Sequence, residues 1–377
     1  MRGVGCRALA RWASSAGAAL LFACSSSPDK PQPTPLEAVS PQIAGRQVWS
    51  ARFEGAIPPV IVSVSGGAFT LAAADGTVVA LAPESGRELW RADVGEKLGS
   101  SAGGDGRYAS VVTRDNELIT LESGRVLWRE PMKARVTTPP LVAGERVFVM
   151  GVDRVVHAFD VRDGRKLWTV QRPGDALTLA LAGVVGPFKD TLLVGQGPRL
   201  AAVDPLRGNM RWEIPLASPR GTNEVERLAD LVGPAARNGD TVCARAFQSA
   251  VGCANAERGT LLWSKNVGGT ASVAADDQYV FGADASGRIT AWRIANGDVA
   301  WTSEKMLYRG LSGPVAFGKA VVFGDVEGQV HFLARDSGQP LLRLPTDGSP
   351  VIGPPALSGS TMLVVTRAGG VFAFRLE

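Results

Sequence analysis

Cysteine and histidine are the side chains most often used for chemistry, and this chain of 377 residues has four of the first and two of the second. Cys243 and Cys253 flank a predicted hairpin. They match Val322 and Phe332 of a later, similar stretch, which face each other if the loop between their strands is a three-residue turn. Cross-strand neighbours bring their Cβ atoms to roughly 4.5–5.5 Å. The sequence therefore predicts a disulfide between Cys243 and Cys253, with two buried thiols as the alternative.

The histidines do not belong to any pattern typical of a metal or catalytic site. His157 and His331 each stand alone inside a predicted strand, and no group of cysteines and histidines has the spacing of a zinc site. The chain also lacks a P-loop, a dinucleotide-binding fingerprint and a nucleophile elbow in a suitable context. Acidic residues are scattered through predicted turns. We therefore predict a protein that is not an enzyme and uses no cofactor or metal.

Residues 1–23 have the layout of a secretory signal. Three arginines precede an apolar stretch that is about half as long as a membrane span. The run from Leu21 to Cys24 then resembles a bacterial lipobox, in which the cysteine is acylated and becomes the new N-terminus. We predict lipidation of Cys24, with a plain signal-peptidase cut as the alternative. Ser25 and Ser26 follow, without the aspartate that retains lipoproteins at the inner membrane, so the expected location is the periplasmic face of the outer membrane.

The segment after Cys24 differs in composition from the rest of the chain. Residues 25–42 contain five prolines among serine, glutamine and threonine, which favours a stiff, unfolded segment. We predict that residues 24–44 form a tether. Removing the signal takes three arginines and no acid from the net charge of +4, which leaves +1. Such a nearly neutral protein lacks the basic surface expected of a nucleic-acid binder.

The elements that position these residues follow a repeat of one glycine, three variable residues and one tryptophan. Seven copies run through the chain, ending at Trp49, Trp90, Trp128, Trp168, Trp212, Trp263 and Trp301. An eighth, Gly338 to Leu342, has leucine in place of tryptophan. The steps between the last residues of successive copies are 41, 38, 40, 44, 51, 38 and 41 residues.

Each repeat unit reads as a small β-sheet. Short β-branched and aromatic runs bounded by turn residues are typical of strands joined by hairpins, and about 40 residues with four strands are typical of a propeller blade. Tryptophan suits the gap between blades, because its indole N–H can reach a backbone carbonyl. Tryptophans in the core of a β-sandwich are the alternative.

The two ends of the repeat array complete each other. The last unit has no outer strand, and the first copy, Gly45 to Trp49, has no blade before it. We therefore predict an all-β, eight-bladed propeller over residues 45–377, made of four-stranded antiparallel blades and closed by an N-terminal strand around Gln47 to Phe53.

Two units are longer than the others, and such propeller loops often carry binding sites. Their additional residues include 175–182 and 222–232. In the second stretch, Val225, Leu228 and Val232 are predicted to share one face of a short helical turn. This turn either faces a partner or caps its own blade.

The blades resemble the repeats of pyrroloquinoline quinone dehydrogenases, and residues 24–377 as a whole resemble the BamB family. That family consists of propeller lipoproteins of the outer-membrane β-barrel assembly machinery. The resemblance is most specific in three stretches, Glu224 to Asp230, Leu307 to Pro314 and Gly324 to Gly328. It implies a scaffold that helps β-barrel proteins to fold and insert into the outer membrane.

In that family the two long loops dock on the periplasmic POTRA domains of the barrel protein BamA. The match implies the same role for five residues of this chain, Leu177, Leu179, Arg227, Leu228 and Asp230. The chain departs from the family pattern at Ala180, where arginine is usual, and at Val232, where an acid is usual. Other subunits of the machinery, and unfolded barrel precursors that add a strand to a blade edge, are further implied partners.

Two other functions stay open. A quinone-dependent periplasmic dehydrogenase is expected, from its own family, to have adjacent cysteines and a calcium site near the ring axis, and this chain has no adjacent cysteine pair. A lipoprotein that binds cell-wall glycan is the other alternative.

Overall fold

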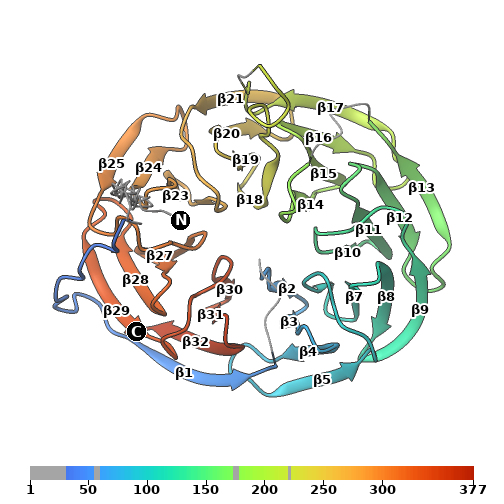
Figure 1. Cartoon of the computed structure of the whole chain (residues 1–377), viewed down its shortest axis with the longest axis horizontal. Helices are drawn as coiled ribbons and strands as arrows, with labels where there is room; N and C mark the ends of the chain where they lie inside the picture. The colour runs from blue at the N-terminus through green and yellow to red at the C-terminus, as the bar shows by residue number, and fades with distance from the viewer. Residues whose placement is uncertain (1–30, 55–59, 173–177, 220–221) are drawn as a thin grey trace, which may run out of the picture. The chain divides into compact units, whose positions relative to one another are not determined.

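Each repeat forms one four-stranded antiparallel sheet, and eight such sheets surround a central axis as the blades of a propeller (Figure 1). The computed structural model describes residues 31–54, 60–172, 178–219 and 222–377. Residues 33–377 make one compact unit. The described residues form strands and turns without an α-helix, so none of them builds a helix that could cross a membrane. The predicted signal, Cys24 and Leu177 lie outside the described residues.

Blades 1 to 4 follow the chain in order, from the inner strand to the outer one. Blade 1 contains β2 (Ser63–Ser65), β3 (Ala68–Ala72), β4 (Thr77–Leu81) and β5 (Glu88–Asp93). Blade 2 contains β6 (Gly103–Gly104), β7 (Tyr108–Val112), β8 (Glu117–Glu122) and β9 (Arg125–Pro131). Blade 3 contains β10 (Leu141–Ala143), β11 (Arg146–Met150), β12 (Val156–Asp160) and β13 (Lys166–Val170). Blade 4 contains β14 (Val185–Phe188), β15 (Thr191–Gln196), β16 (Arg199–Val203) and β17 (Met210–Pro215).

Blades 5 to 8 continue the ring in the same way. Blade 5 contains β18 (Leu231–Asn238), β19 (Thr241–Ala246), β20 (Ala250–Asn255) and β21 (Thr260–Lys265). Blade 6 contains β22 (Ala274–Ala275), β23 (Tyr279–Ala283), β24 (Ile289–Arg293) and β25 (Val299–Ser303). Blade 7 contains β26 (Val315–Phe317), β27 (Ala320–Gly324), β28 (Gln329–Ala334) and β29 (Pro340–Pro345). Blade 8 contains β30 (Ala356–Ser358), β31 (Thr361–Val365), β32 (Gly370–Leu376) and, as its outer strand, β1 (Gly45–Arg52).

The ring is closed by the two ends of the propeller, as the sequence predicts. β1 pairs antiparallel with β32 from Gly45 opposite Leu376 to Arg52 opposite Gly370 (Figure 1). The first strand of the propeller therefore completes the last blade, and the eight-bladed prediction is confirmed.

The repeat residues hold neighbouring blades together. A Cβ atom added at Gly86 would lie 2.6 Å from the Trp49 ring of the preceding blade, and at Gly297 it would lie 2.6 Å from Trp263. The indole N–H of Trp49 donates a hydrogen bond to the Pro83 carbonyl at 2.9 Å. Four more indoles bond to the following blade in the same way, those of Trp128, Trp168, Trp263 and Trp301. Glycine is required here because only a residue without a side chain lets the ring pack this closely.

The predicted pairing of the two cysteines is present in blade 5. Cys243 on β19 lies opposite Cys253 on β20, and a disulfide joins them. Val322 and Phe332 are opposite each other at the same place in blade 7. The register of one repeat was thus enough to place the two cysteines of another.

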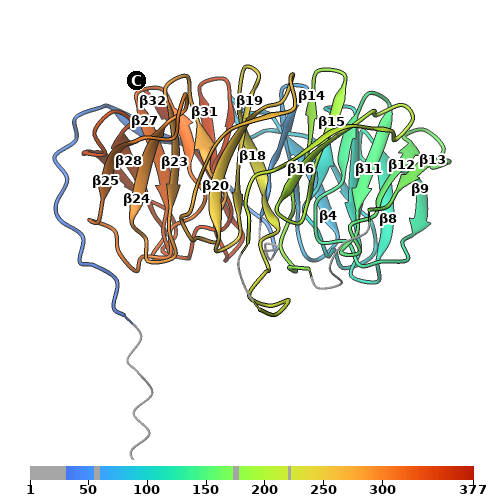
Figure 2. The same ribbon diagram turned by 90° about the horizontal axis from the view of Figure 1, so that it is seen from above.

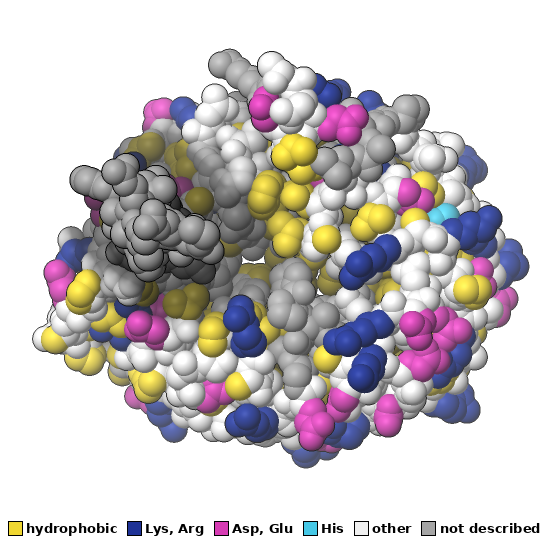
Figure 3. Space-filling view, viewed as in Figure 1, with side chains coloured by type: hydrophobic (Ala, Val, Ile, Leu, Met, Phe, Trp, Pro, Cys, Tyr) yellow, Lys and Arg dark blue, Asp and Glu magenta, His cyan; other side chains and the backbone are white. Residues whose placement is uncertain are grey.

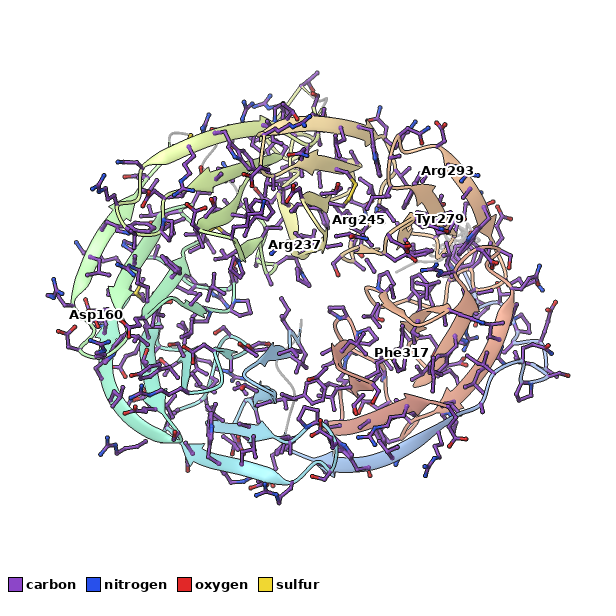
Figure 4. All side chains as sticks on the ribbon, turned by 180° about the vertical axis from the view of Figure 1, so that it is seen from behind. Asp160, Arg237, Arg245, Tyr279, Arg293 and Phe317 are labelled. Carbon is purple, nitrogen blue, oxygen red and sulfur yellow. A yellow bond between two sulfur atoms is a disulfide. The ribbon has the colours of Figure 1, made fainter. Side chains whose placement is uncertain are left out.

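Arg245 joins blades 5 and 6 from the inner part of the ring (Figure 4). Its side chain is completely buried and donates to four backbone carbonyls, those of Val267, Gly268, Ala271 and Ala283. Burial lowers the pKa of Arg245 to about 10, so the guanidinium stays charged at neutral pH. Carbonyl dipoles, rather than a carboxylate within hydrogen-bond reach, balance this charge.

Candidate partner-binding site

The two long loops lie on the same face of the ring, which we call the loop face. Strand direction alternates within a blade, so every second connection along the chain lies on the same face. The loop face therefore consists of the connections between blades and the turns between the second and third strands of each blade. Figure 2 shows the connection from β17 to β18 extending beyond the ring on this face, away from the C-terminus. The sequence therefore places its longest loop where a partner can reach it.

Asp230 joins the two long loops. One carboxylate oxygen, Oδ2, accepts the backbone N–H of Leu179 at 2.8 Å. The other, Oδ1, accepts a hydrogen bond from Nη2 of Arg154 at 3.0 Å. The side chains of Arg154 and Asp230 are 16% and 18% exposed, so solvent still reaches the pair. We call this contact the loop junction.

Backbone pairing extends the loop junction toward the ring. Val232 forms an isolated antiparallel bridge with Gly183, and the N–H of Gly233 donates to the Ala182 carbonyl at 2.9 Å. Val232 is consequently buried in β18 and does not share a helical face with Val225 and Leu228. That part of the prediction is wrong, because pairing with the other long loop draws Val232 into a strand.

The tip of the second loop is a capped turn. Oδ1 of Asn223 accepts the N–H of Glu226 at 2.9 Å, and Oε2 of Glu226 accepts the N–H of Thr222 at 2.7 Å. Such reciprocal capping satisfies donors that a short turn leaves unpaired. The hydrogen bond from the Thr222 N–H, followed by the one from its hydroxyl, lowers the pKa of Glu226. The turn presents Val225 with 68% of its surface exposed.

Four of the five expected contact residues are described, and all four lie on the loop face. Leu179 and Asp230 are in direct contact. Arg227 and Leu228 follow the capped turn and are half-buried, and Arg227 forms no ion pair with another described residue. Sequence reasoning missed Arg154, because the hairpin turn that carries it belongs to a repeat unit of ordinary length.

The cavity between the two loops is small. It measures about 40 Å³ and is lined by Thr138, Leu179, Asp230 and Val232 among others. This is enough for about one water molecule, whereas small-molecule sites commonly measure about 300–1,000 Å³. Among the described residues, no three His, Cys, Asp or Glu side chains gather so as to hold a metal ion. The junction is therefore suited to contact a macromolecule through its surface.

A second polar cluster lies on the loop face at blade 7, and it is buried. Oδ2 of Asp325 accepts hydrogen bonds from Nε of Arg309 at 2.8 Å and from Nε2 of His331 at 2.9 Å. Nε of Arg343 donates to Nδ1 of His331 at 3.3 Å, which assigns the ring proton of His331 to Nε2. Arg309 also contacts Glu327. Two of the stretches that carry the family resemblance supply Arg309, Asp325 and Glu327.

This cluster holds the N-terminal segment. Nη1 of Arg309 donates to the Thr34 carbonyl at 3.0 Å, and Nη1 of Arg343 donates to the Glu37 carbonyl at 2.9 Å. The Thr34 N–H donates to the Leu307 carbonyl at 3.0 Å. The described part of the predicted tether is thus extended but attached to the ring, because two arginines supply the donors that its proline-rich backbone needs. We call this contact the N-terminal latch.

Burial and hydrogen bonding set the protonation of the latch. Burial lowers the pKa of His331, and the hydrogen bond to Asp325 opposes that shift only in part. Burial works to raise the pKa of Asp325, but bonds from His331, the Gln329 N–H and Arg309 outweigh it, so the pKa is lowered. At neutral pH the latch therefore holds a neutral histidine and an aspartate whose charge Arg309 balances.

Comparison with known proteins agrees with the repeat and the ring. The family model described as "Outer membrane protein assembly factor BamB" matches residues 74–303. The chain is 35% identical to the protein of that name from Burkholderia pseudomallei, over 96% of each chain. It is 32% identical to that from Bordetella pertussis, over 93% of this chain and 92% of that one. The chain belongs to the BamB family.

Solved structures show the fold that BamB proteins share with other propellers. The crystal structure of BamB from Moraxella catarrhalis matches with a TM-score of 0.79 at 21% identity, over 88% of this chain and all of that one. A quinohemoprotein alcohol dehydrogenase from Pseudomonas putida matches with a TM-score of 0.65 at 13% identity, over 88% and 76%. At such identities each match concerns the fold alone.

Proposed function

We propose that this protein is an outer-membrane assembly factor that acts as a scaffold. Its loop face binds the periplasmic POTRA domains of BamA, and the protein thereby assists the folding and insertion of β-barrel proteins. The observation that supports this most strongly is the loop junction, where Asp230 fixes both long loops side by side on one face of a rigid ring. Membership of a family of assembly factors supports the same role.

The composition of the loop junction fits a modest, specific interface. Leu179 and Leu228 are half-buried, Val225 is exposed, and Arg227 and Asp230 lie beside them. A small apolar centre with a charged rim is typical of such contacts, and few of its residues carry most of the binding energy. Leu177, which lies outside the described residues, is proposed as a further apolar contact.

Anchoring belongs to the same proposal. Acylation of Cys24 with at least two chains gives stable attachment to a membrane, where one chain alone is marginal. The protein then acts at the periplasmic face of the outer membrane. Mass spectrometry of the Cys24 peptide tests this directly, and the expected result is a triacylated N-terminal cysteine.

Binding is tested by purifying the tagged protein in mild detergent and identifying the proteins that elute with it. We expect BamA in the eluate of the wild-type protein and its loss from the variant Leu179→Asp with Arg227→Ala. The matched control is Val299→Asp, at an exposed position of the outer strand β25. Retention of BamA by the loop variant contradicts the proposal. Capture by peptidoglycan that survives the loop changes, without BamA, supports the glycan-binding alternative.

A further inference from the structure

Beside the loop junction, the loop face carries a row of four exposed cations. Lys97 lies in the connection between blades 1 and 2, Arg114 in the turn between β7 and β8, and Lys133 and Arg135 in the connection between blades 2 and 3. Figure 3 shows Lys and Arg side chains gathered on this face over blades 2 and 3. None of the four forms an ion pair with another described residue. We call these residues the basic row.

Two of the acids near the basic row are paired with a cation. Nη1 of Arg129 binds Glu96 at 2.9 Å and Glu117 at 2.8 Å. Asp75 and Asp153 accept only backbone N–H groups, those of Thr77 at 2.9 Å and Val155 at 3.1 Å, so their charges stay free. Asp115, next to Arg114, is a third exposed acid without an ion pair to another described residue. The row therefore presents four positive charges beside three acids that no cation of the described residues neutralises, which leaves a small positive excess.

The backbone that carries the row is fixed before any partner binds. Nδ2 of Asn116 donates to the carbonyls of Met132 and Ala134 at 2.7 and 2.6 Å, and Oδ1 accepts the Val136 N–H at 3.0 Å. These bonds clamp the loop on which Lys133 and Arg135 lie. Asn116 adopts a φ of 69°, a conformation that asparagine tolerates better than most residues. The Arg114 N–H donates to the Lys97 carbonyl at 2.8 Å, so all four cations lie on connected loops.

The row is also continuous with the loop junction. The N–H of Val152 donates to the Arg135 carbonyl at 2.8 Å. Two residues further along the same turn, Arg154 binds Asp230, which in turn holds Leu179. A partner domain that covers the junction and extends over the neighbouring blades therefore meets the basic row.

We propose that the basic row is the electrostatic part of the docking surface, and that the partner covers it with a carboxylate-rich protein surface. The inference rests on the proposed function, because it takes the loop junction as the apolar anchor of the same interface. Charges at the rim of an interface steer encounter, so they change the association rate and its salt dependence more than the dissociation rate. The junction and the row thus have separable kinetic effects.

The test combines Arg114→Glu, Lys133→Glu and Arg135→Glu and measures binding kinetics with purified POTRA domains of BamA. At low salt we expect association to slow by about tenfold or more, with little change in dissociation and a weaker dependence of association on salt. The control reverses Arg87, Arg207 and Arg258, which are exposed, belong to turns on the opposite face and change the net charge equally. Circular dichroism confirms that both variants are folded.

Each further outcome has a defined meaning. Equal association rates and salt dependence for the row variant and the control overturn the inference, while faster dissociation of Leu179→Asp still supports the proposed function. If the row variant no longer binds vesicles containing phosphatidylglycerol but binds POTRA domains as the wild type does, the inference is also overturned, since the row then contacts lipid. If the wild-type protein does not bind POTRA domains at all, the proposed function itself fails.

Discussion

Two arginine–aspartate ion pairs on the loop face differ in how deeply they are buried. In the N-terminal latch, Arg309 and Asp325 form an ion pair whose side chains are 2% and 0% exposed. In the loop junction, the corresponding pair is Arg154 and Asp230, with 16% and 18% exposed. Each pair holds a segment that is distant in sequence, Thr34 in the latch and Leu179 in the junction.

The difference in burial separates a structural role from a binding role. A buried carboxylate is costly unless every partner is present, so the latch tolerates little change. The junction is partly hydrated, which reduces the cost of rearranging it. We therefore expect damage to the latch to affect stability first, and damage to the junction to affect partner binding first.

The largest expected effect comes from breaking the latch with Arg309→Ala. This change leaves Asp325 buried without its guanidinium and frees the Thr34 carbonyl, so we expect a loss of about 3–5 kcal/mol in the free energy of unfolding. Urea denaturation measures it. Arg343→Ala, which leaves the ion pair intact, is the control and is expected to lose less. A loss below about 1 kcal/mol for Arg309→Ala contradicts the structural role of the latch.

The corresponding change at the junction, Asp230→Ala, is expected to cost about 1–3 kcal/mol, because it removes acceptors from Leu179 and Arg154 at a site that water can reach. Faster hydrogen exchange at the Leu179 amide is the specific readout. Asp230→Asn keeps an acceptor and is expected to fall between the variant and the wild type. A cost equal to that of Arg309→Ala means that burial does not separate the two sites.

A smaller effect is expected from pH. Because the pKa of His331 is lowered in the folded state, the unfolded chain takes up a proton first as the pH falls below its ordinary value of about 6.5. Stability is therefore complete above that value and declines as the pH falls toward the folded pKa. Burial lowers the pKa of His157 in the same direction. We expect His331→Gln to remove the pH dependence of the attachment of the N-terminal segment. His157→Gln is expected to leave that dependence in place, because His157 is not part of the latch.

The smallest effect is expected at the tip of the second long loop. Glu226→Gln weakens the capping of Thr222 and Asn223, but the turn is exposed and packs little against the ring. Amide exchange at Thr222 is expected to increase while the urea midpoint stays unchanged. A shifted midpoint shows that this turn supports the fold as well as the binding surface.

Most of the fold could be predicted from the repeat, because residues at the same position of each copy have the same structural role. The glycines and tryptophans gave the number of blades, the closing strand and the cysteine pair. Contacts between loops that are not equivalent in the repeat left no periodic signal. The pairing of Gly183 with Val232, the ion pair of Arg154 with Asp230 and the attachment of Thr34 each depend on where loops of different blades meet.

The pairing of β1 with β32 has a consequence for biogenesis. Among the described strands of the propeller, Gly45–Arg52 comes first in the chain and its partner Gly370–Leu376 comes last. Until β32 is in place, blade 8 lacks the strand between β1 and β31 and two sheet edges stay open, and open edges invite aggregation. A chain without Gly370–Leu376 would therefore keep both edges open, so this single strand decides whether the ring closes.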